Sequence, residues 1–164
     1  MDNNYDLPES LRRAMRHWTA GVTIVTSYEP GERNGMTVNS FASISLDPPV
    51  VAVTLANSTR TYALVDHTRQ FGVTILGEKE KELSDRFAGR MANITDRLEG
   101  LETFEMVSGV PLIKAGLAHL DCKVIFKYPL PNSTLFLGSV LAADWQEDGQ
   151  PLVYFNRDYH RLSS

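Results

Sequence analysis

The chain has 164 residues, enough for about one domain, and 43% of them are hydrophobic, so an ordinary core can form. Charged residues make up 22%, the formal net charge is -4, and lysine and arginine are scattered, which argues against disorder and against nucleic-acid binding. The apolar runs are too short for a membrane span, and the acidic start MDNNYDLPES is unlike a signal peptide. We therefore expect one soluble domain over residues 1–164, located in the cytoplasm.

In the first part of the chain, residues 10–19 place apolar side chains at helical spacing after a candidate cap at Ser10. The runs 22–28 (VTIVTSY) and 50–56 (VVAVTLA) are rich in β-branched residues and predict strands, the second buried on both faces. Glu29-Pro30-Gly31 predicts a turn, and Asn34-Gly35 is the strongest hairpin-turn signal in the chain. A strand studded with polar residues follows it and ends at Pro48-Pro49.

After residue 56 the sequence predicts a polar loop (57–61), a short helix (61–67), a strand (70–76) and a charged helix (78–87) that ends near Gly89. Residues 90–109 lack a clean period, two long strands follow at 117–130 and 133–146, and 151–162 reads as a last strand and tail. Strands do not alternate regularly with helices, and no phosphate-binding glycine motif is present, so a Rossmann sheet is disfavoured. A small closed antiparallel barrel fits the roughly six strands better.

The most informative stretch is NGMTVNSFASISLDPP, residues 34–49. It threads small hydroxyl and amide side chains among apolar residues, more than a strand needs if it only fills a core. Such groups can hydrogen-bond a flat ligand that is rich in heteroatoms, whereas the alternative is a polar outer face turned to solvent. The residues assigned to ligand binding here are Met36, Thr37, Val38, Asn39, Ser40 and Ser45.

A second candidate is the loop ANSTRT, residues 56–61, which precedes a short helix and offers three hydroxyls, one amide and one guanidinium. The free N–H groups at a helix N-terminus and a guanidinium together favour phosphate binding. The alternative is a plain capping loop, which would need only one of these hydroxyls. The residues assigned to phosphate binding are Ala56, Asn57, Ser58, Thr59, Arg60 and Thr61.

The single cysteine, Cys122, cannot form an intrachain disulfide and lies in an alternating run, so it is interpreted as a buried hydrophobic residue. The histidines show no metal-ligand spacing, and we predict no metal site. They are His17, His67, His119 and His160.

Nearly the whole chain resembles the short-chain flavin reductases, the NAD(P)H-dependent reductase components of two-component flavin monooxygenases. The resemblance runs through LRRAMRHWTAGVTIVTS, GMTVNSFASISLDPPVVAVTL, FGVTILGEKEKELSDRFAG, PLIKAGLAHLDCKV, STLFLGSV and PLVYFNRDYHRL. It implies a mainly β fold, an FMN-binding split β-barrel of Greek-key type with a few short helices. It also implies a homodimer that binds FMN or FAD near the dimer interface, with NADH or NADPH as the electron donor.

The resemblance also assigns roles to two further segments. The element Phe87-Ala88-Gly89 matches one that lies beside the cofactor in the family, although Phe87 fits a core aromatic at a helix end nearly as well. The closing segment approaches the nicotinamide and the flavin in the family, whereas the alternative is a solvated C-terminus. Its assigned residues are Asn156, Arg157 and Tyr159 for cofactor binding and His160 for catalysis.

One departure from the family separates two functions. Asn132 and Ser133 stand where relatives commonly carry Asp-His, and a serine cannot act as a cation or an aromatic platform. The leading interpretation is a flavin reductase that transfers hydride from NAD(P)H to FMN or FAD and supplies reduced flavin to a separate flavin-dependent monooxygenase. The departure favours the alternative, a flavin carrier of the same fold without efficient NAD(P)H oxidation.

Overall fold

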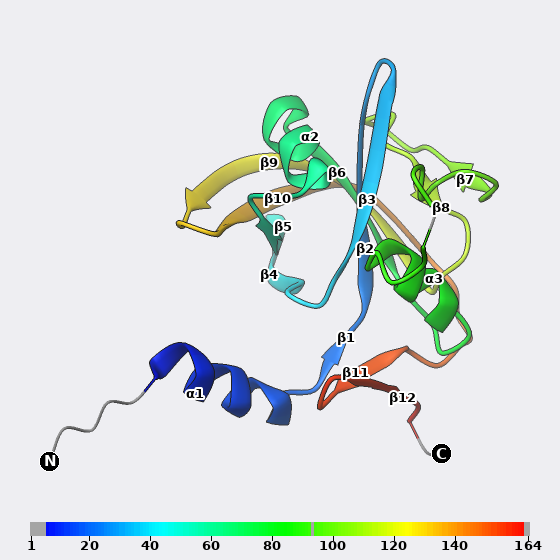
Figure 1. Cartoon of the computed structure of the whole chain (residues 1–164). Helices are drawn as coiled ribbons and strands as arrows, with labels where there is room; N and C mark the ends of the chain where they lie inside the picture. The colour runs from blue at the N-terminus through cyan, green and yellow to red at the C-terminus, as the bar shows by residue number, and fades with distance from the viewer. Residues whose placement is uncertain (1–5, 93, 163–164) are drawn as a thin grey trace, which may run out of the picture.

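The computed structural model describes residues 6–92 and 94–162. Its main body is a seven-stranded antiparallel sheet with strand order β3-β2-β6-β9-β10-β5-β4 (Figure 1). The mainly β, antiparallel fold predicted from the sequence is confirmed. The strands are β2 (Thr23–Glu29), β3 (Glu32–Val38), β4 (Ala42–Leu46), β5 (Pro49–Ala56), β6 (Gln70–Ile75), β9 (Ala118–Pro129) and β10 (Ser133–Trp145).

Smaller elements surround this sheet. A second sheet has the order β1-β11-β12, and β7 pairs with β8 inside the irregular excursion that follows α3. None of the helices within residues 6–92 and 94–162 has the length and apolar character needed to span a bilayer. The bounds are α1 (Leu7–Ala14), the 3-10 turn η1 (Met15–His17), β1 (Ala20–Gly21), α2 (Arg60–Thr68), α3 (Lys81–Phe87), β7 (Thr103–Phe104), β8 (Leu112–Ile113), β11 (Val153–Phe155) and β12 (Asp158–His160).

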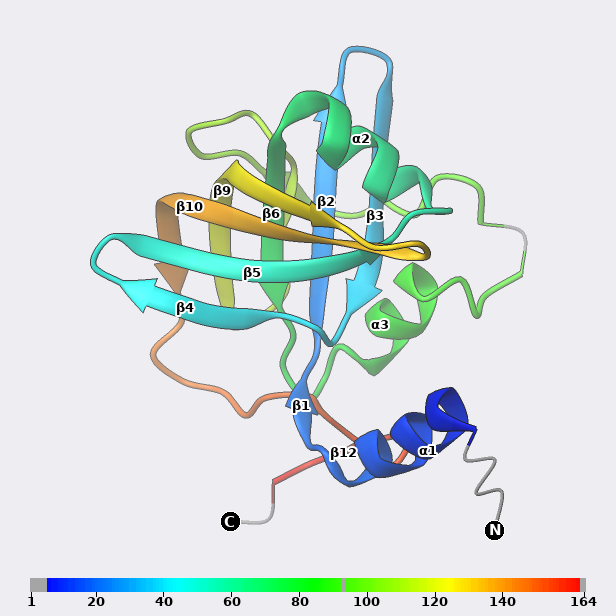
Figure 2. The same ribbon diagram turned by 90° about the vertical axis from the view of Figure 1, so that its left-hand side faces the viewer.

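The main sheet curls until its two edges come close together (Figure 2). Its outermost strands, β3 and β4, are consecutive in the chain and are joined only by residues 39–41. In that link, the Ser40 hydroxyl donates to the Thr54 carbonyl (2.9 Å) and accepts from the Thr54 N–H (3.1 Å) of β5. The edges β3 and β4 do not pair with each other in the described residues, so the predicted closed barrel is not formed by strand pairing.

The core fills the inside of this curled sheet. Phe71 of β6 is fully buried, and its ring approaches Gly138 of β10 so closely that a Cβ there would lie 2.5 Å from the ring. The pairing of β10 with β9 shifts register at the same glycine, so the chain bends where the aromatic ring needs room. Buried residues of this cluster are Val25, Val38, Val51, Val53, Leu55, Val65, Phe71, Val73, Cys122, Val124 and Phe136.

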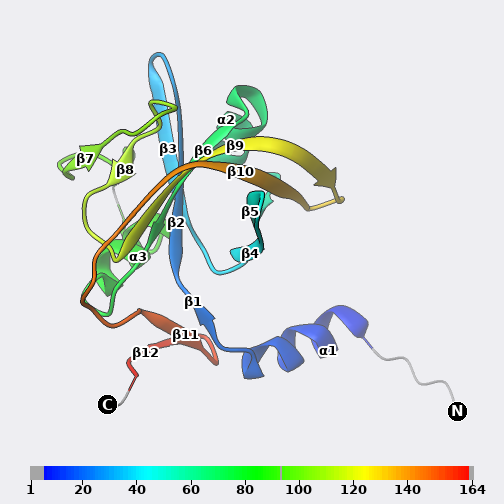
Figure 3. The same ribbon diagram turned by 180° about the vertical axis from the view of Figure 1, so that it is seen from behind.

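The N-terminal helix begins earlier than predicted. Asp6, not Ser10, caps α1, because its carboxylate accepts from the Glu9 N–H (3.3 Å) and a proline follows in the first turn. The helix has no buried residue and projects from the main body, as Figures 1 and 3 show. Its exposed apolar residues, with those of the following turn, are Leu7, Leu11, Met15 and Trp18.

The predicted hairpin turn at Asn34-Gly35 is wrong. Both residues lie inside β3, paired with Ser27 and Thr26 of β2. The chain turns at Pro30-Gly31, which confirms the turn predicted at Glu29-Pro30-Gly31. Gly31 has a φ of 91°, a conformation that glycine adopts without strain, so the hairpin forms its turn here and not at Asn34-Gly35. The strand predicted to run on to Pro48 is likewise divided into β3 and β4, and the predicted helix 78–87 begins only at Lys81.

Candidate functional site

Two connected cavities lie where the end of β3 meets the C-terminal hairpin, β11–β12. The smaller, called the inner pocket here, has a volume of about 160 Å³ and is lined by Val22, Thr37, Asn39, Ala88, Arg90, Tyr154 and Tyr159. The larger, the outer groove, has a volume of about 540 Å³ and is lined by Arg12, Met15, Arg16, Trp18, Ala20, Asn39, Ser40, Phe41, Ala42, Tyr154, Asn156 and Arg157. Because both cavities share Asn39 and Tyr154, they form one site.

This site unites three segments that the sequence singled out separately. The end of β3, the end of α3 and the C-terminal hairpin are far apart in the chain, and the fold brings them to the same cavities. The predicted site residues that line the cavities are Thr37, Asn39, Ser40, Ala88, Asn156, Arg157 and Tyr159.

A tyrosine attaches the C-terminal hairpin to α3. The Tyr159 hydroxyl lies 2.7 Å from the Ser84 hydroxyl, and the Thr37 hydroxyl donates to the Ser84 carbonyl (2.6 Å). The Arg90 guanidinium lies 5.6 Å from the centre of the Tyr159 ring, within cation–π range, and also donates to Asp85 (2.9 Å). Burial raises the pKa of Tyr159, so its hydroxyl stays protonated and this contact holds at neutral pH. β3, α3 and the hairpin thus meet around one neutral phenol.

The outer groove contains an unsatisfied donor. The Nε of Arg16 is buried and has no hydrogen-bond partner within the described part of the chain. The Arg16 carbonyl meanwhile accepts from the Asn156 N–H (3.1 Å), which ties η1 to the turn of the C-terminal hairpin. A buried N–H without an acceptor is costly, so this guanidinium suits a bound acceptor such as a phosphate or a carbonyl oxygen.

The loop 56–61 is built as predicted, but part of its polarity serves the fold. Thr59 caps α2, accepting from the Tyr62 N–H (3.2 Å) and donating to the Ala56 carbonyl (2.8 Å). Asn57 donates to the Leu130 carbonyl (2.9 Å) and accepts from the Thr134 hydroxyl (2.8 Å). Ser58 and Arg60 are exposed, and their side chains have no recorded partner in residues 6–92 and 94–162. These two, with the free N–H groups of α2, remain to bind an anion.

The loop and the inner pocket lie along the same strand. The Thr59 hydroxyl is 3.6 Å from the Met36 sulfur, and the Thr61 hydroxyl is 3.4 Å from the Asn34 amide oxygen. Asn34 and Met36 precede Thr37 and Asn39 in and just after β3, so the predicted ring-binding and phosphate-binding segments are neighbours along one strand.

Other predicted residues do not line the two cavities. Phe87 is fully buried in the core cluster that contains Val22 and Leu76, which favours the core alternative that the sequence left open; its cofactor contact stays a prediction. The Val38 side chain is also buried, which leaves only its backbone for a ligand. Ser45 lies on β4 opposite Val50.

Gly89 and His160 also lie outside the cavity linings. Gly89 has a φ of 72° just after α3, where a glycine ends the helix without strain. The need to end the helix therefore explains a glycine at this position as well as cofactor binding does. His160 is exposed on β12, pairs with Val153 and lies with its ring 5.8 Å from that of Phe155. Its catalytic role stays a prediction.

The sequence reasoning missed Arg16, Arg90 and Tyr154. Arg90 directly follows the Phe87-Ala88-Gly89 element, so its position next to a segment already assigned to the cofactor was an available signal. Tyr154 pairs with Ala20 of β1 and packs on Tyr159 with ring centroids 5.6 Å apart. Only the pairing of chain ends places it in the site, and no local pattern indicates that pairing.

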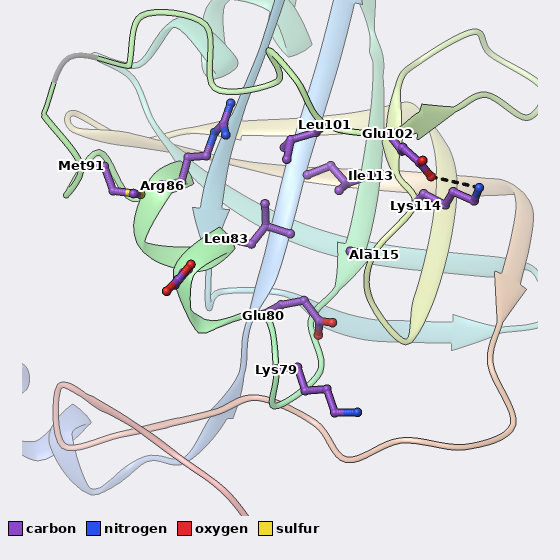
Figure 4. A pocket seen from close by; sticks show the side chains of 11 residues that line it. Lys79, Glu80, Leu83, Arg86, Met91, Leu101, Glu102, Ile113, Lys114 and Ala115 are labelled. Atoms are coloured by element: carbon purple, nitrogen blue, oxygen red, sulfur yellow. Dashed lines mark ion pairs between the residues drawn. The ribbon is translucent and has the colours of Figure 1, made fainter.

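A further cavity of about 490 Å³ lies on the other side of α3 (Figure 4). Leu83, Leu101 and Ile113 form its apolar part, and Glu102 pairs with Lys114 at 3.0 Å on its rim. None of the residues predicted to bind a ligand lines this cavity. Acidic and basic side chains alternate around it, so its charge does not favour any one class of ligand.

The remaining reactive side chains are structural. His119 is buried, with Nε2 2.8 Å from the Ile113 carbonyl, and holds the excursion after α3 against β9. Burial raises the pKa of Cys122 to about 12, so its thiol stays protonated and is a poor nucleophile. Across the described ranges, no three His, Cys, Asp or Glu side chains gather as a metal site would require.

Comparison with known proteins finds relatives that are named as flavin reductases. Residues 15–163 match the flavin reductase like domain. An NADH-dependent flavin reductase from a Rhodococcus species is 36% identical over 158 residues, covering 94% of this chain and 86% of the relative. The reductase component of 4-hydroxyphenylacetate 3-monooxygenase from Thermus thermophilus is 32% identical over 156 residues, covering 95% and 97%.

A solved structure extends the comparison to ligands. The Streptomyces globisporus NADH:FAD oxidoreductase SgcE6, in complex with NAD and FAD fragments, superposes with a TM-score of 0.86 at 28% identity and covers 95% of this chain and 93% of that one. The match of the family model to almost the whole chain, together with relatives above 30% identity, establishes the assignment. The chain belongs to the flavin reductase like family.

Proposed function

We propose that this chain is an NAD(P)H-dependent flavin reductase, an oxidoreductase that reduces FMN or FAD. The observation that carries the proposal is the meeting of β3, the end of α3 and the C-terminal hairpin around the inner pocket, next to the loop 56–61. Relatives with this family assignment are named as NADH-dependent flavin reductases, and the choice of NADH over NADPH follows those names.

The residues present fit a flavin. The loop 56–61 offers Ser58, Arg60 and the N-terminus of α2 to the phosphate, and Asn39 and the backbone after β3 offer hydrogen bonds to the ring system. The buried, unsatisfied Nε of Arg16 is the observation that argues most directly for a bound acceptor in the outer groove. When bound, the flavin supplies the hydride-accepting centre, and the protein needs to supply only position and electrostatics.

The chain's own residues therefore act by holding the flavin and the nicotinamide in the correct relative position. Hydride transfer requires the reacting atoms to approach to about 3–3.5 Å, so a rigid wall matters more than an acid or a base. Tyr159 and Thr37, both bonded to Ser84, fix the distance between the C-terminal hairpin and β3. Arg16 and Arg157 supply positive charge in the outer groove for the phosphates of the nicotinamide dinucleotide.

The position that departs from the family lies away from these cavities. Ser133 pairs with Ala56 at the start of the loop 56–61, and the Asn132 carbonyl accepts from the Asn57 N–H (3.1 Å). The residue pair thus supports the loop in this chain, and loss of the family's histidine leaves the Tyr159 contacts intact. This observation favours the reductase over the carrier.

We further propose a split β-barrel that functions as a homodimer. The close approach of β3 to β5 through Ser40 supports the barrel, and the exposed apolar side chains of α1 support a second subunit that covers them. Leu46 on β4 is 88% exposed and Trp145 at the end of β10 is 65% exposed, which extends the apolar surface beyond α1. Size-exclusion chromatography with light scattering tests this, and a monomer at micromolar concentration would contradict it.

We also propose that the reduced flavin passes to a separate flavin-dependent monooxygenase, since relatives are named as reductase components of such systems. The cytoplasmic location expected from the sequence stays a prediction.

Rapid mixing of the flavin-loaded protein with NADH tests the reductase against the carrier. Loss of the flavin absorbance near 450 nm within a catalytic turnover supports the reductase, because typical turnover numbers lie at about 1–1000 per second. Retention of the yellow colour for minutes, with tight flavin binding, would support the carrier instead. A chain that binds no flavin would contradict both.

A further inference from the structure

One wall of the inner pocket carries a positive charge. Of the lining residues, all within the described part of the chain, Arg90 alone has a basic or a carboxyl side chain, and the others are apolar residues, hydroxyls and one amide. The hydrogen bond to Asp85 raises the pKa of Arg90, and burial raises the pKa of Tyr159, so the guanidinium stays charged and the phenol stays neutral. The pocket therefore presents a cation to its occupant.

The neighbours of Arg90 fix its position. Its Nη1 donates to the Asp85 carboxylate at 2.9 Å, and its backbone N–H donates to the Asp85 carbonyl at 3.0 Å. The guanidinium lies 5.6 Å from the centre of the Tyr159 ring, and the Lys81 Nζ lies 5.7 Å from the same centre. Neither Asp85 nor Lys81 lines the pocket, so the cationic end of the Arg90–Asp85 pair is the end that the cavity meets.

The size and polarity of the pocket suit one end of a flavin ring system. Its volume of about 160 Å³ is too small for a whole flavin. The Asn39 amide, which has no recorded side-chain partner in residues 6–92 and 94–162, and the Arg90 guanidinium both offer donors there. The pyrimidine end of the ring system has the carbonyl oxygens and ring nitrogens that accept such bonds, whereas the dimethylbenzene end has no acceptor.

Reduction changes the charge at the pyrimidine end. Hydride transfer from NADH breaks the C4–H bond of the nicotinamide, forms the N5–H bond and gives NAD⁺, so two electrons and one proton arrive together. Without a second proton the ring system gains one negative charge, which lies on the N1 and C2 carbonyl side of the pyrimidine. A fixed cation beside that side stabilises the reduced form more than the oxidised form.

We propose that Arg90 makes the chain bind anionic reduced flavin more tightly than oxidised flavin, and thereby raises the reduction potential of the bound flavin. The inference rests on the proposed function and gives Arg90 an electrostatic role in the reaction, separate from its contact with Tyr159. The effect is moderate, because the Asp85 carboxylate offsets part of the charge and the Arg90 side chain is 50% exposed.

The test measures the reduction potential of protein-bound FMN, which contains the whole ring system, by anaerobic equilibration with a redox dye. Arg90→Gln should reduce the preference for reduced over oxidised FMN roughly three- to tenfold, which lowers the potential by about 14–30 mV. Arg90→Lys should recover more than half of the loss, because it keeps the charge. Lys127→Gln is the matched control, because it breaks an ion pair of similar exposure, with Asp66, and lines neither cavity.

Asp85→Asn separates charge from packing. It removes the same ion pair as Arg90→Gln but leaves the guanidinium without its counter-charge, so the potential of bound FMN should rise. Loss of packing alone would shift the potential in the same direction in both variants. Opposite shifts therefore support the proposal, and shifts of the same sign would overturn it.

A pH series on the unmodified protein gives a further readout. A tenfold change in proton concentration shifts a two-electron potential by about 30 mV for each proton taken up, so the slope halves at the pH above which the reduced flavin stays anionic. This change of slope should come at lower pH for bound than for free FMN, and Arg90→Gln should move it back toward the free value. Coincident changes for bound and free FMN would contradict the proposal.

Two failures remain distinguishable. If Arg90→Gln leaves the potential unchanged and only raises the KM for NADH, the residue acts through the C-terminal hairpin, and its redox role is overturned while the reductase stands. If the unmodified protein binds neither FMN nor FAD, the proposed function itself is overturned, and the role of Arg90 with it.

Discussion

The loop 56–61 and the C-terminal hairpin both face the proposed cofactor, but the fold holds them in different ways. The loop is tied at several points: Asn57 bonds to the turn between β9 and β10 through its backbone and its side chain, and Thr59 caps α2. The hairpin is held by the pairing of β11 with β1 and by the Tyr159–Ser84 hydrogen bond, while its turn residues Asn156 and Arg157 and its end residue His160 are exposed. We propose that the loop is a preformed anion site and that the more exposed hairpin is the wall that contacts the nicotinamide.

The difference is reasonable for a protein with two ligands. A flavin must hold one position until it has received the hydride, and rigid, preformed phosphate contacts favour this because little ordering entropy is lost on binding. A nicotinamide dinucleotide must enter and leave in every cycle, so the part that contacts it needs low local stability. Removing a single contact of the loop should therefore affect flavin binding, whereas removing a single contact of the hairpin should affect NADH binding.

The largest effect is expected for Asn57→Ala. The substitution leaves the buried Thr134 hydroxyl without its acceptor, at a cost of about 1–3 kcal/mol. It also removes the exposed hydrogen bond to the Leu130 carbonyl. Chemical denaturation should show the loss, and flavin affinity should fall with it. Asn132→Ala is the control, because its side chain is exposed and only its carbonyl supports the loop. Unchanged stability in Asn57→Ala would mean that the loop is not prepared by the fold.

Arg60→Ala separates binding from folding in the same loop. Arg60 is exposed and has no recorded ion pair in the described residues, so the free energy of unfolding should stay within about 0.5 kcal/mol. Flavin affinity should weaken by roughly 1–3 kcal/mol, the loss of one charged hydrogen bond. Arg60→Lys should recover part of it, since it keeps the charge but not the fork of donors. An unchanged titration curve would remove Arg60 from the phosphate site.

A smaller effect is expected for Tyr159→Phe. The change removes one hydrogen bond, to Ser84, and keeps the ring between Tyr154 and Arg90, so stability should fall by about 0.5–1.5 kcal/mol. The KM for NADH should rise while flavin affinity stays constant, if the hairpin serves the nicotinamide. Tyr28→Phe is the control, because that side chain is exposed and lines neither cavity. A loss of flavin affinity as large as that for NADH would show that the hairpin and the loop are not separate anchors.

The same tyrosine predicts a pH dependence. Its pKa is raised in the folded state by burial, so above the ordinary tyrosine pKa of about 10 the folded state binds more protons than the unfolded state. Stability is therefore full below pH 10 and falls as the pH rises through the raised value. The fall should be shallower in Tyr159→Phe, and both proteins should behave alike between pH 6 and 9.

The strands could be predicted from the sequence, and the turns between them less well. Alternating β-branched residues gave β2 and β5 because burial of one or both faces fixes such runs as strands. Asn34-Gly35 misled the prediction because Gly31, three residues earlier, already provides a left-handed turn, and the Asn34 side chain instead bonds Gly35 and Thr61. A local turn signal does not reveal which of two nearby candidates the strand pairing will select.

The site could be predicted in part for a similar reason. Thr37, Asn39 and Ser40 stood out because polar side chains in an apolar strand need partners, and the Ser40 hydroxyl already has one in Thr54 of β5. Arg16 and Tyr154 reach the site only through the pairing of β1 with β11, which joins the two ends of the chain. That contact depends on topology, and no spacing in the sequence encodes it.

The smallest effect is expected for His160→Ala, which changes an exposed residue at the end of the hairpin. His160 is exposed, pairs through its backbone with Val153, and lies outside the lining of both cavities, so neither stability nor flavin affinity should change measurably. If its imidazole bonds the dinucleotide, flavin reduction by NADH should slow by roughly two- to fivefold, equivalent to about 0.4–1 kcal/mol. His67→Ala, an exposed histidine on α2, is the control in the same rapid-mixing experiment. An unchanged rate would end the catalytic assignment of His160, and a collapse of flavin binding would show that the hairpin, like the loop, anchors the flavin itself.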